Sequence, residues 1–251
     1  MRHAQAITNF AAALVVTGAT SAASAADWYT GAPADVAADD YIVAIDAAAT
    51  VTSNSSAFGV VTATIAPVTP LNESGPRLRL QGLSGVYSYP GSTTGRTVRG
   101  EQEEGTAMFG YEWIWKQAAL AGYVGFNVRN NELSVLDPHN PVVGTGVGAK
   151  FAADLYLNPT TETLFAANAS YSTLFRAYYV RVKAGFAVAD GVFIGPEATL
   201  LGDAYFNQWR LGAHLTGFAV GPMKFSLGAG YAHDRVQKGG YYTSVEGRAA
   251  F

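Results

Sequence analysis

The stretch Tyr241-Tyr-Thr-Ser-Val-Glu-Gly-Arg-Ala-Ala-Phe251 decides how the rest of this chain is interpreted. With a period of two, one face carries Tyr241, Thr243, Val245, Gly247, Ala249 and Phe251, and the other carries Tyr242, Ser244, Glu246, Arg248 and Ala250. A mostly apolar face opposite a carboxylate and a guanidinium is typical of a strand between lipid and a wet lumen. An edge strand of a soluble β-sandwich alternates in the same way, so this stretch alone leaves both architectures open.

The first residues of the chain predict export. A basic start at Met1-Arg2-His3, an apolar stretch around residues 10–16 and a small-x-small site at Ala23-Ser24-Ala25 are the parts of a secretory signal peptide. The apolar stretch is too short and too rich in Ala and Thr for a lasting transmembrane helix. We therefore expect a cleaved signal peptide over residues 1–25, followed by a periplasmic lead-in over residues 26–39.

Composition favours a membrane barrel over a globular domain. The chain has no cysteine, which excludes a disulfide-stapled fold and any Cys-based metal site or nucleophile. Charged residues make up 14% of the chain, against about 25% in typical soluble domains. No later segment supplies the roughly 18 unbroken apolar residues that a spanning helix needs. The net charge of −3 and the lack of a Lys/Arg cluster argue against nucleic-acid binding.

Alternating segments follow one another along the mature chain. They cover residues 40–51, 57–66, 77–89, 103–115, 118–129, 146–157, 162–172, 177–188, 192–202, 208–219, 223–233 and 241–251. Each segment is near the roughly 9–11 residues that cross a bilayer with tilt. The sequence therefore predicts an all-β, antiparallel transmembrane barrel of about 12 strands over residues 40–251.

Strand parity assigns a set of charged side chains to the lumen. These candidates are Glu104, Glu112, Lys150, Asp154, Arg181, Lys183, Glu197, Arg210, His214, Glu246 and Arg248. A slip of one residue would move such charges into lipid, at ~2–4 kcal/mol each near the midplane, so the register is well specified. Aromatic residues gather toward strand ends, as expected for interfacial girdles.

The connectors predict which end of the barrel faces outward. Long connectors over residues 90–100 and 130–144 alternate with tight turns such as Lys116-Gln117. Outer-membrane barrels combine short periplasmic turns with longer outer loops; the long connector over residues 67–76 is the exception here. A strand that ends on Phe251 resembles the C-terminal signal of bacterial outer-membrane barrels. We therefore expect Phe251 to be an assembly signal read by the barrel assembly machinery, and outer-membrane lipid to surround the barrel.

Several stretches resemble the cellulose biosynthesis protein BcsS family. They are Asp137–Lys150, Ser170–Phe175, Phe193–Gly202 and Arg210–Gly217. The likeness covers roughly residues 40–251, and its most specific blocks are Ile-Gly-Pro-Glu-Ala and Arg-Leu-Gly-Ala-His-Leu-Thr-Gly. The resemblance implies an exported outer-membrane protein associated with cellulose synthesis operons of certain Gram-negative bacteria. A cellulose chain or components of the cellulose synthase complex would then be its partners, and no catalytic residue is implied.

Three kinds of chemistry find little support in the residues. A membrane hydrolase needs a Ser/His pair on the lipid face, and none of His139, His214 and His233 is expected beside a Ser there. Glycosidases use two carboxylates, but the inward carboxylates share their face with Lys and Arg and are expected to pair with them. No set of three or four metal ligands is placed by the sequence. We expect no enzyme activity, no cofactor and no metal.

A conduit and a scaffold remain. Twelve strands enclose more room than eight, whose side chains fill the interior, and less than a sixteen-stranded porin. An aromatic ladder would be expected where a glucan slides; the inward candidates are Tyr87, Tyr156, Tyr179 and Tyr242, although interface girdles are the more usual role of barrel tyrosines. We predict a non-enzymatic accessory protein of cellulose synthesis or export. The alternatives are a general small-solute porin, or a barrel enzyme acting on polysaccharide or lipid.

Overall fold

The computed structural model describes residues 41–91, 96–221 and 223–251. The expected signal peptide over residues 1–25 and the lead-in over residues 26–39 lie outside the described residues. No helix in the described part of the chain is long and apolar enough to cross a membrane.

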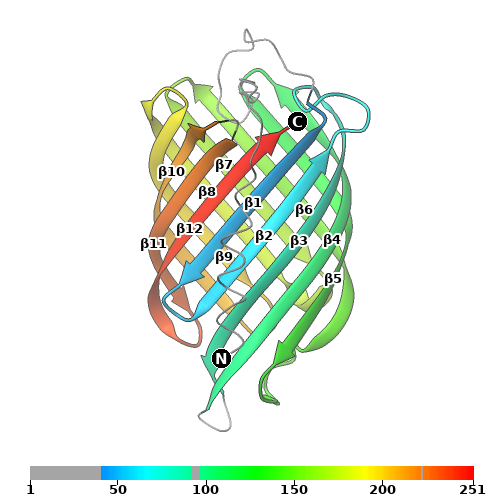
Figure 1. Ribbon diagram of the computed structural model, residues 1–251, viewed down its shortest axis with the longest axis vertical. Helices are drawn as coiled ribbons and strands as arrows, with labels where there is room; N and C mark the ends of the chain where they lie inside the picture. Colours follow the sequence, from blue (N-terminus) through cyan, green and yellow to red (C-terminus); the bar gives the residue numbers. More distant parts are fainter. Residues whose placement is uncertain (1–40, 92–95, 222) are drawn as a thin grey trace.

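Twelve antiparallel strands close into one barrel (Figure 1). They are β1 (Val43–Thr52), β2 (Ser56–Ile65), β3 (Gly75–Pro90), β4 (Thr97–Trp115), β5 (Ala118–Leu133), β6 (Gly144–Thr160), β7 (Thr163–Ser172), β8 (Tyr178–Ala189), β9 (Val192–Gly202), β10 (Asn207–Val220), β11 (Met223–Asp234) and β12 (Lys238–Ala250). Each strand pairs with its neighbours in sequence, and β12 pairs with β1. The predicted barrel is confirmed, and the 241–251 stretch forms its seam.

The side chains of each strand alternate between the outer wall and the lumen. In β4, for example, Phe109, Tyr111 and Trp113 are exposed, whereas Gly110 and Glu112 between them are buried. A band of exposed apolar and aromatic side chains on the outside of a closed barrel is the surface that a lipid bilayer requires, because lipid cannot satisfy polar groups.

The two ends of the barrel differ in their connectors. At one end, the upper end in Figure 1, consecutive strands join through short turns such as Lys116-Gln117 and Asp190-Gly191; the connector over residues 66–74 is longer. We call this end the periplasmic end, because short turns face the periplasm in outer-membrane barrels. The opposite, outer end holds longer connectors over residues 134–143 and 203–206.

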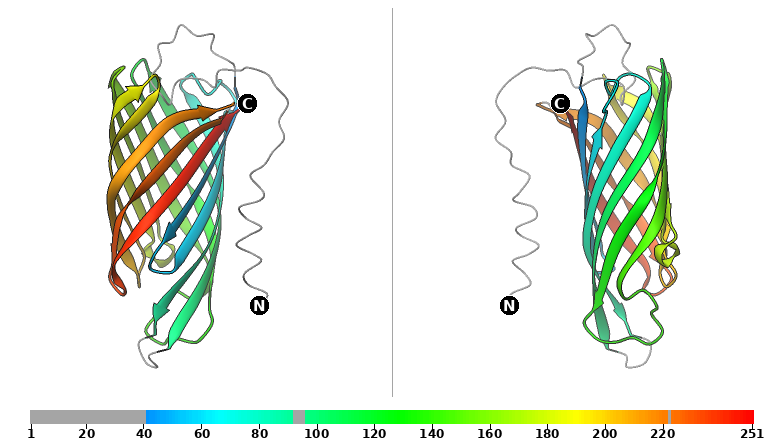
Figure 2. Two further views of the ribbon diagram at one scale, coloured as in Figure 1. Left: turned by 60° about the vertical axis from the view of Figure 1, so that its left-hand side comes forward. Right: turned by 90° about the vertical axis from the view of Figure 1, so that its right-hand side faces the viewer.

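Four long strands extend one side of the barrel at its outer end. Strands β3–β6 have 16, 19, 16 and 17 residues, whereas the others have 10–14. Figure 2 shows this side extending beyond the rest. The connectors expected over residues 90–100 and 130–144 are shorter in the structure, since β4 begins at Thr97 and β5 ends at Leu133. They cover residues 91–96 and 134–143. Beyond the bilayer, water can contact both faces of a strand. The strands therefore stay hydrogen-bonded to one another there, although their side chains no longer alternate between apolar and polar.

Candidate functional site

Paired charges cross the middle of the lumen. Arg181 on β8 donates to Glu197 on β9 at 2.6 Å and also to Glu246 on β12. Lys183 donates to the Glu246 carboxylate at 3.1 Å and to the Ser226 hydroxyl at 2.9 Å. Strands β8 and β12 are not neighbours in the sheet. These contacts therefore span the interior rather than run along one wall.

Polar side chains around this network satisfy one another. Tyr242 donates its hydroxyl hydrogen to Glu197 at 2.7 Å, and the guanidinium of Arg210 lies 5.6 Å from the centre of the Tyr242 ring. His214 is 2% exposed, and its Nε2 lies 3.0 Å from the Ala184 carbonyl oxygen. Because a carbonyl only accepts, Nε2 carries the hydrogen and His214 donates there. His214 thus has a structural contact rather than a free imidazole.

A second group of charges lies against β3–β6. Lys150 on β6 donates to Glu104 on β4 at 2.5 Å, and its ammonium is also within 3.2 Å of the Gln81 side-chain oxygen. Both ionic side chains are nearly buried, with 10% and 7% of their surface exposed. The two groups together occupy opposite sides of the lumen.

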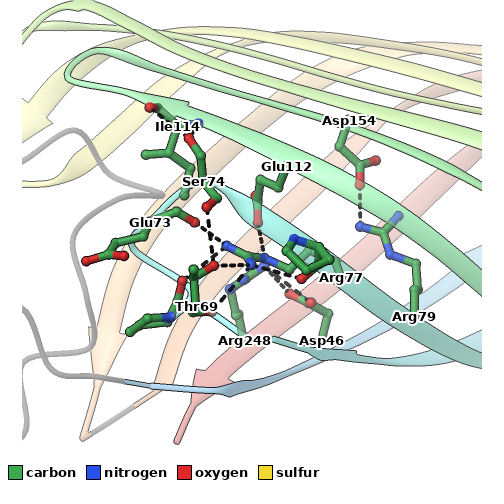
Figure 3. Close-up of polar contacts among 12 residues, drawn as sticks. Asp46, Thr69, Glu73, Ser74, Arg77, Arg79, Glu112, Ile114, Asp154 and Arg248 are labelled. Carbon is green, nitrogen blue, oxygen red and sulfur yellow. Dashed lines mark hydrogen bonds and ion pairs between the residues drawn. The ribbon is translucent and has the colours of Figure 1, made fainter. Parts of the chain in front are cut away.

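Arg77 closes the periplasmic end by holding the 66–74 connector. The Arg77 side chain is fully buried, and its Nε donates to Glu112 at 2.8 Å. Its other nitrogens donate to backbone carbonyls of the connector, at 3.2 Å to Pro70 and also to Glu73 (Figure 3). Ser74 is tied to β4 as well, since its hydroxyl accepts from the Ile114 amide at 2.8 Å. One buried guanidinium therefore fastens the connector across this mouth.

A small cavity remains just inside the periplasmic end. Arg79 pairs with Asp154 beside it, and Arg248 pairs with Asp46 at 3.0 Å (Figure 3). The cavity has a volume of about 20 Å³. Since one water needs about 10–15 Å³ on this measure, it holds about one water molecule.

Two connectors fold over the outer mouth. Asn140 donates to the Tyr89 hydroxyl at 2.9 Å, and the Tyr205 hydroxyl donates to Asp137 at 3.2 Å. Arg129 inside the barrel pairs with Asp203 on the second connector at 3.2 Å. Burial raises the pKa of the Tyr205 phenol above its ordinary value, and the nearby Tyr89 and Asp137 add to the rise. The phenol therefore stays protonated as a hydrogen-bond donor.

The four sequence-predicted tyrosines do not form one ladder. Tyr156 is packed toward the periplasmic end with Ala119, Leu164 and Phe193. Tyr242 bonds to Glu197, and Tyr179 lies beside Arg181. Tyr87 instead lies in a row of rings that includes residues outside the prediction, namely Phe58, Tyr89 and Tyr205. Strand parity could have placed Phe58 and Tyr89 inside, but the position of Tyr205 depends on how its connector folds.

Other lumen contacts also escaped the sequence prediction. Asp46 pairs with Arg248 across the seam, and Asp137 and Asp203 reach the lumen from connectors. The two-residue alternation of β1 could have placed Asp46 in the lumen. Asp137 and Asp203 lie in connectors, where no such period predicts the direction of a side chain. Among the described residues, no group of three or more His, Asp or Glu side chains is arranged to hold a metal ion.

A closed antiparallel barrel with an apolar outer wall and a charged lumen defines a bacterial outer-membrane β-barrel protein. Among solved structures, the chain is similar to an outer-membrane channel from Pseudomonas putida F1, at 13% identity, covering 88% of this chain and 99% of that chain with a TM-score of 0.54. It is also similar to the KdgM porin, at 9% identity, 81% and 97% coverage and a TM-score of 0.43. At 13% identity, the likeness to the Pseudomonas channel shows the fold alone.

The chain belongs to the cellulose biosynthesis protein BcsS family, whose family model matches residues 14–251. No curated protein matches the sequence. The family resemblance seen in the sequence is therefore confirmed, and with it the place of this outer-membrane barrel among cellulose biosynthesis proteins.

Proposed function

We propose that this protein is a non-enzymatic accessory component of cellulose synthesis or export that acts as a docking or structural element, with a closed lumen. The observation that carries the proposal is the Arg181 network, in which side chains of β8, β9 and β12 meet across the interior. Such an arrangement stabilises a fixed barrel and places paired charged side chains across the path that a polymer would take.

The two ends support the closed lumen. At the periplasmic end, Arg77 holds the 66–74 connector in the mouth. At the outer end, Asn140 and Asp137 hold the 134–143 connector to Tyr89 and Tyr205. The small cavity just inside the periplasmic end has space for about one water and is far smaller than a sugar residue.

The contacts of the inward carboxylates argue against glycoside hydrolysis. A glycosidase needs one carboxyl that can act as a general acid and a second that reaches the sugar. Here each inward carboxylate of the prediction is already paired with a cation: Glu104 with Lys150, Glu112 with Arg77, Asp154 with Arg79, and Glu197 and Glu246 with Arg181. Because each of these side chains is already engaged by a cation, none is free to reach the sugar as a glycosidase carboxyl must.

The partners follow from the surfaces. The outer wall contacts membrane lipid. We propose that the barrel is inserted by the barrel assembly machinery, and that its two ends are available to a cellulose chain or to components of the cellulose synthase complex.

Gene deletion with quantification of cellulose tests the proposed function. We expect deletion to lower cellulose output, and the wild-type gene to restore it. Single Gln variants of Glu112, Asp154 and Glu197 should restore it equally, provided that each folds. Unchanged cellulose after deletion would refute an accessory role, and loss with one folded Gln variant alone would favour an enzyme. A steady conductance of the wild-type protein in planar bilayers would contradict the closed lumen.

A further inference from the structure

Three aromatic rings line the inner wall at the outer mouth, and a fourth reaches them from the 203–206 connector. The ring centres of Phe58 and Tyr87 are 6.4 Å apart, and those of Tyr87 and Tyr89 are 6.2 Å apart. Their planes differ by only 11° and 15°. The Tyr205 ring continues the row, 5.4 Å from Tyr89 at an angle of 56°. We call these four residues the aromatic platform.

Two glycines make room for the platform against the wall. A Cβ atom on Gly85 would lie 2.0 Å from the Phe58 ring, and one on Gly100 would lie 2.2 Å from the Tyr87 ring. The two rings therefore lie flat over the glycine backbones, as rings do when they cover a cross-strand glycine. One face of each ring is used in this contact. Both residues are only partly buried, so part of each ring stays exposed.

Polar groups stand beside the platform on β4 and β5. Arg129 donates to Gln102 at 2.5 Å and to the Asn131 side-chain oxygen at 3.3 Å. Asn131 is 1% exposed, and within the described residues its Nδ2 donor has no hydrogen-bond partner. A buried donor left unpaired lowers the stability of the fold. This amide is therefore prepared to donate to an oxygen that enters the mouth.

We propose that the aromatic platform binds a neutral β-linked glucan at the outer mouth. The partly buried rings of Phe58 and Tyr87 are the stacking surface, and the buried Tyr89, 5% exposed, supports Tyr87 from beside it. The hydroxyls of a β-1,4-linked glucose chain are equatorial, so both ring faces carry only C–H groups, which stack on flat aromatic faces. The hydroxyl edges then meet the amides of Asn131 and Gln102. Arg129 and Asp203 form an ion pair at 3.2 Å. Neither of these two charges is therefore free to bind an ionic polysaccharide.

The site is a place of attachment and not a passage. The ion pairs of Lys150 and Arg181 cross the lumen below it. The hydroxyls of Tyr89 and Tyr205 are held by Asn140 and Asp137, which fixes the two rings before a ligand arrives. The choice of a glucan rests on the proposed function, whereas the preference for a neutral sugar with flat faces rests on the rings and amides.

Titration of the purified, folded wild-type barrel with cellohexaose, followed by calorimetry, tests the inference. We expect saturable binding, and a loss of at least tenfold in affinity for Tyr87→Ala. Phe58→Leu, which keeps an apolar side chain but removes the ring, should weaken binding in the same direction. The matched control is Tyr241→Ala, because Tyr241 is an outer-end tyrosine that points away from the lumen and is 73% exposed. It should bind as the wild type does.

Heat-modifiable migration on gels confirms that each variant is folded before titration. No binding by the folded wild type, an equal loss in Tyr241→Ala, or equal binding of cellohexaose, maltohexaose and oligogalacturonate would each overturn the inference. These outcomes are separable from the proposed function. A barrel needed for cellulose output that does not bind cellohexaose refutes only the platform, and a barrel that binds but is dispensable refutes only the accessory role.

Discussion

Arg77 Nε and Glu112 Oε2 lie 2.8 Å apart at the periplasmic mouth, with only 0% and 6% of their side-chain surfaces exposed. Burying two charges costs several kcal/mol per ion, and their mutual attraction offsets that cost only while both partners are present. The same guanidinium also holds the 66–74 connector. This pair is therefore both a buried ion pair and the fastening of the periplasmic closure.

Removing one partner of this pair should be far more damaging than replacing both. Glu112→Ala leaves the Arg77 charge buried without its anion, and we expect it to lower the free energy of unfolding by about 3–5 kcal/mol. The double variant Arg77→Met with Glu112→Leu should recover part of that loss. Urea unfolding of the barrel in vesicles, followed by tryptophan fluorescence, measures both. Equal losses in the single and double variants would show that packing, and not the unpaired charge, sets the cost.

Adjacent glutamates on β4 provide a test of the register. Glu104 faces the lumen and bonds to Lys150 at 2.5 Å, whereas Glu103 is exposed on the outer face. Glu104→Ala leaves Lys150 almost buried and without its carboxylate, so we expect a loss of about 3 kcal/mol. Glu103→Ala removes an exposed charge and should change stability little. The same urea experiment compares the two, and a reversal of their order would contradict the assigned faces.

Strand alternation explains why so much of the barrel was predictable. Glu112 lies between Tyr111 and Trp113 in the sequence, so the two-residue period puts it on the opposite face of β4. That face must be the lumen, because lipid accepts the aromatic face and not the charged one. The 134–143 connector has no such period, so the contacts of Asp137 and Asn140 could not be foreseen. Which inward groups pair across the lumen, such as Arg181 with Glu246, depends on barrel closure, because these residues are 65 positions apart.

The outer closure should be insensitive to pH until the phenol of Tyr205 ionises. Burial raises the Tyr205 pKa, so the folded state favours the protonated form. Its contribution is fully present below the unfolded pKa of about 10 and is lost as pH rises beyond it. We expect proteolysis of the 134–143 connector to be constant from about pH 6 to pH 9 and to increase above about pH 10. In Tyr205→Phe the connector should be cleaved faster already at neutral pH; unchanged cleavage would show that this hydrogen bond does not hold it.

Substitution of Phe251 tests whether assembly and stability depend on different parts of this residue. Its backbone closes the seam, since its amide donates to the Val43 carbonyl and its carbonyl accepts from the Ile42 amide, both at 2.8 Å. Its side chain, however, is 62% exposed and adds little to the packing of the fold. If the ring is the signal that the assembly machinery reads, Phe251→Ala should reduce the heat-modifiable barrel in cells while leaving the urea stability of refolded protein nearly unchanged.

Phe186→Ala is the matched control for Phe251→Ala, because that ring is 68% exposed on the outer face of β8, away from the seam. It should leave assembly in cells near the wild-type level, because it removes only a ring that faces lipid. A defect caused by lost lipid contact alone would be equal in the two variants. Normal amounts of folded Phe251→Ala in cells would refute the signal. An equal defect in Phe186→Ala would assign the effect to the lipid-facing surface, and a defect that appears in refolding as well would assign it to the seam itself.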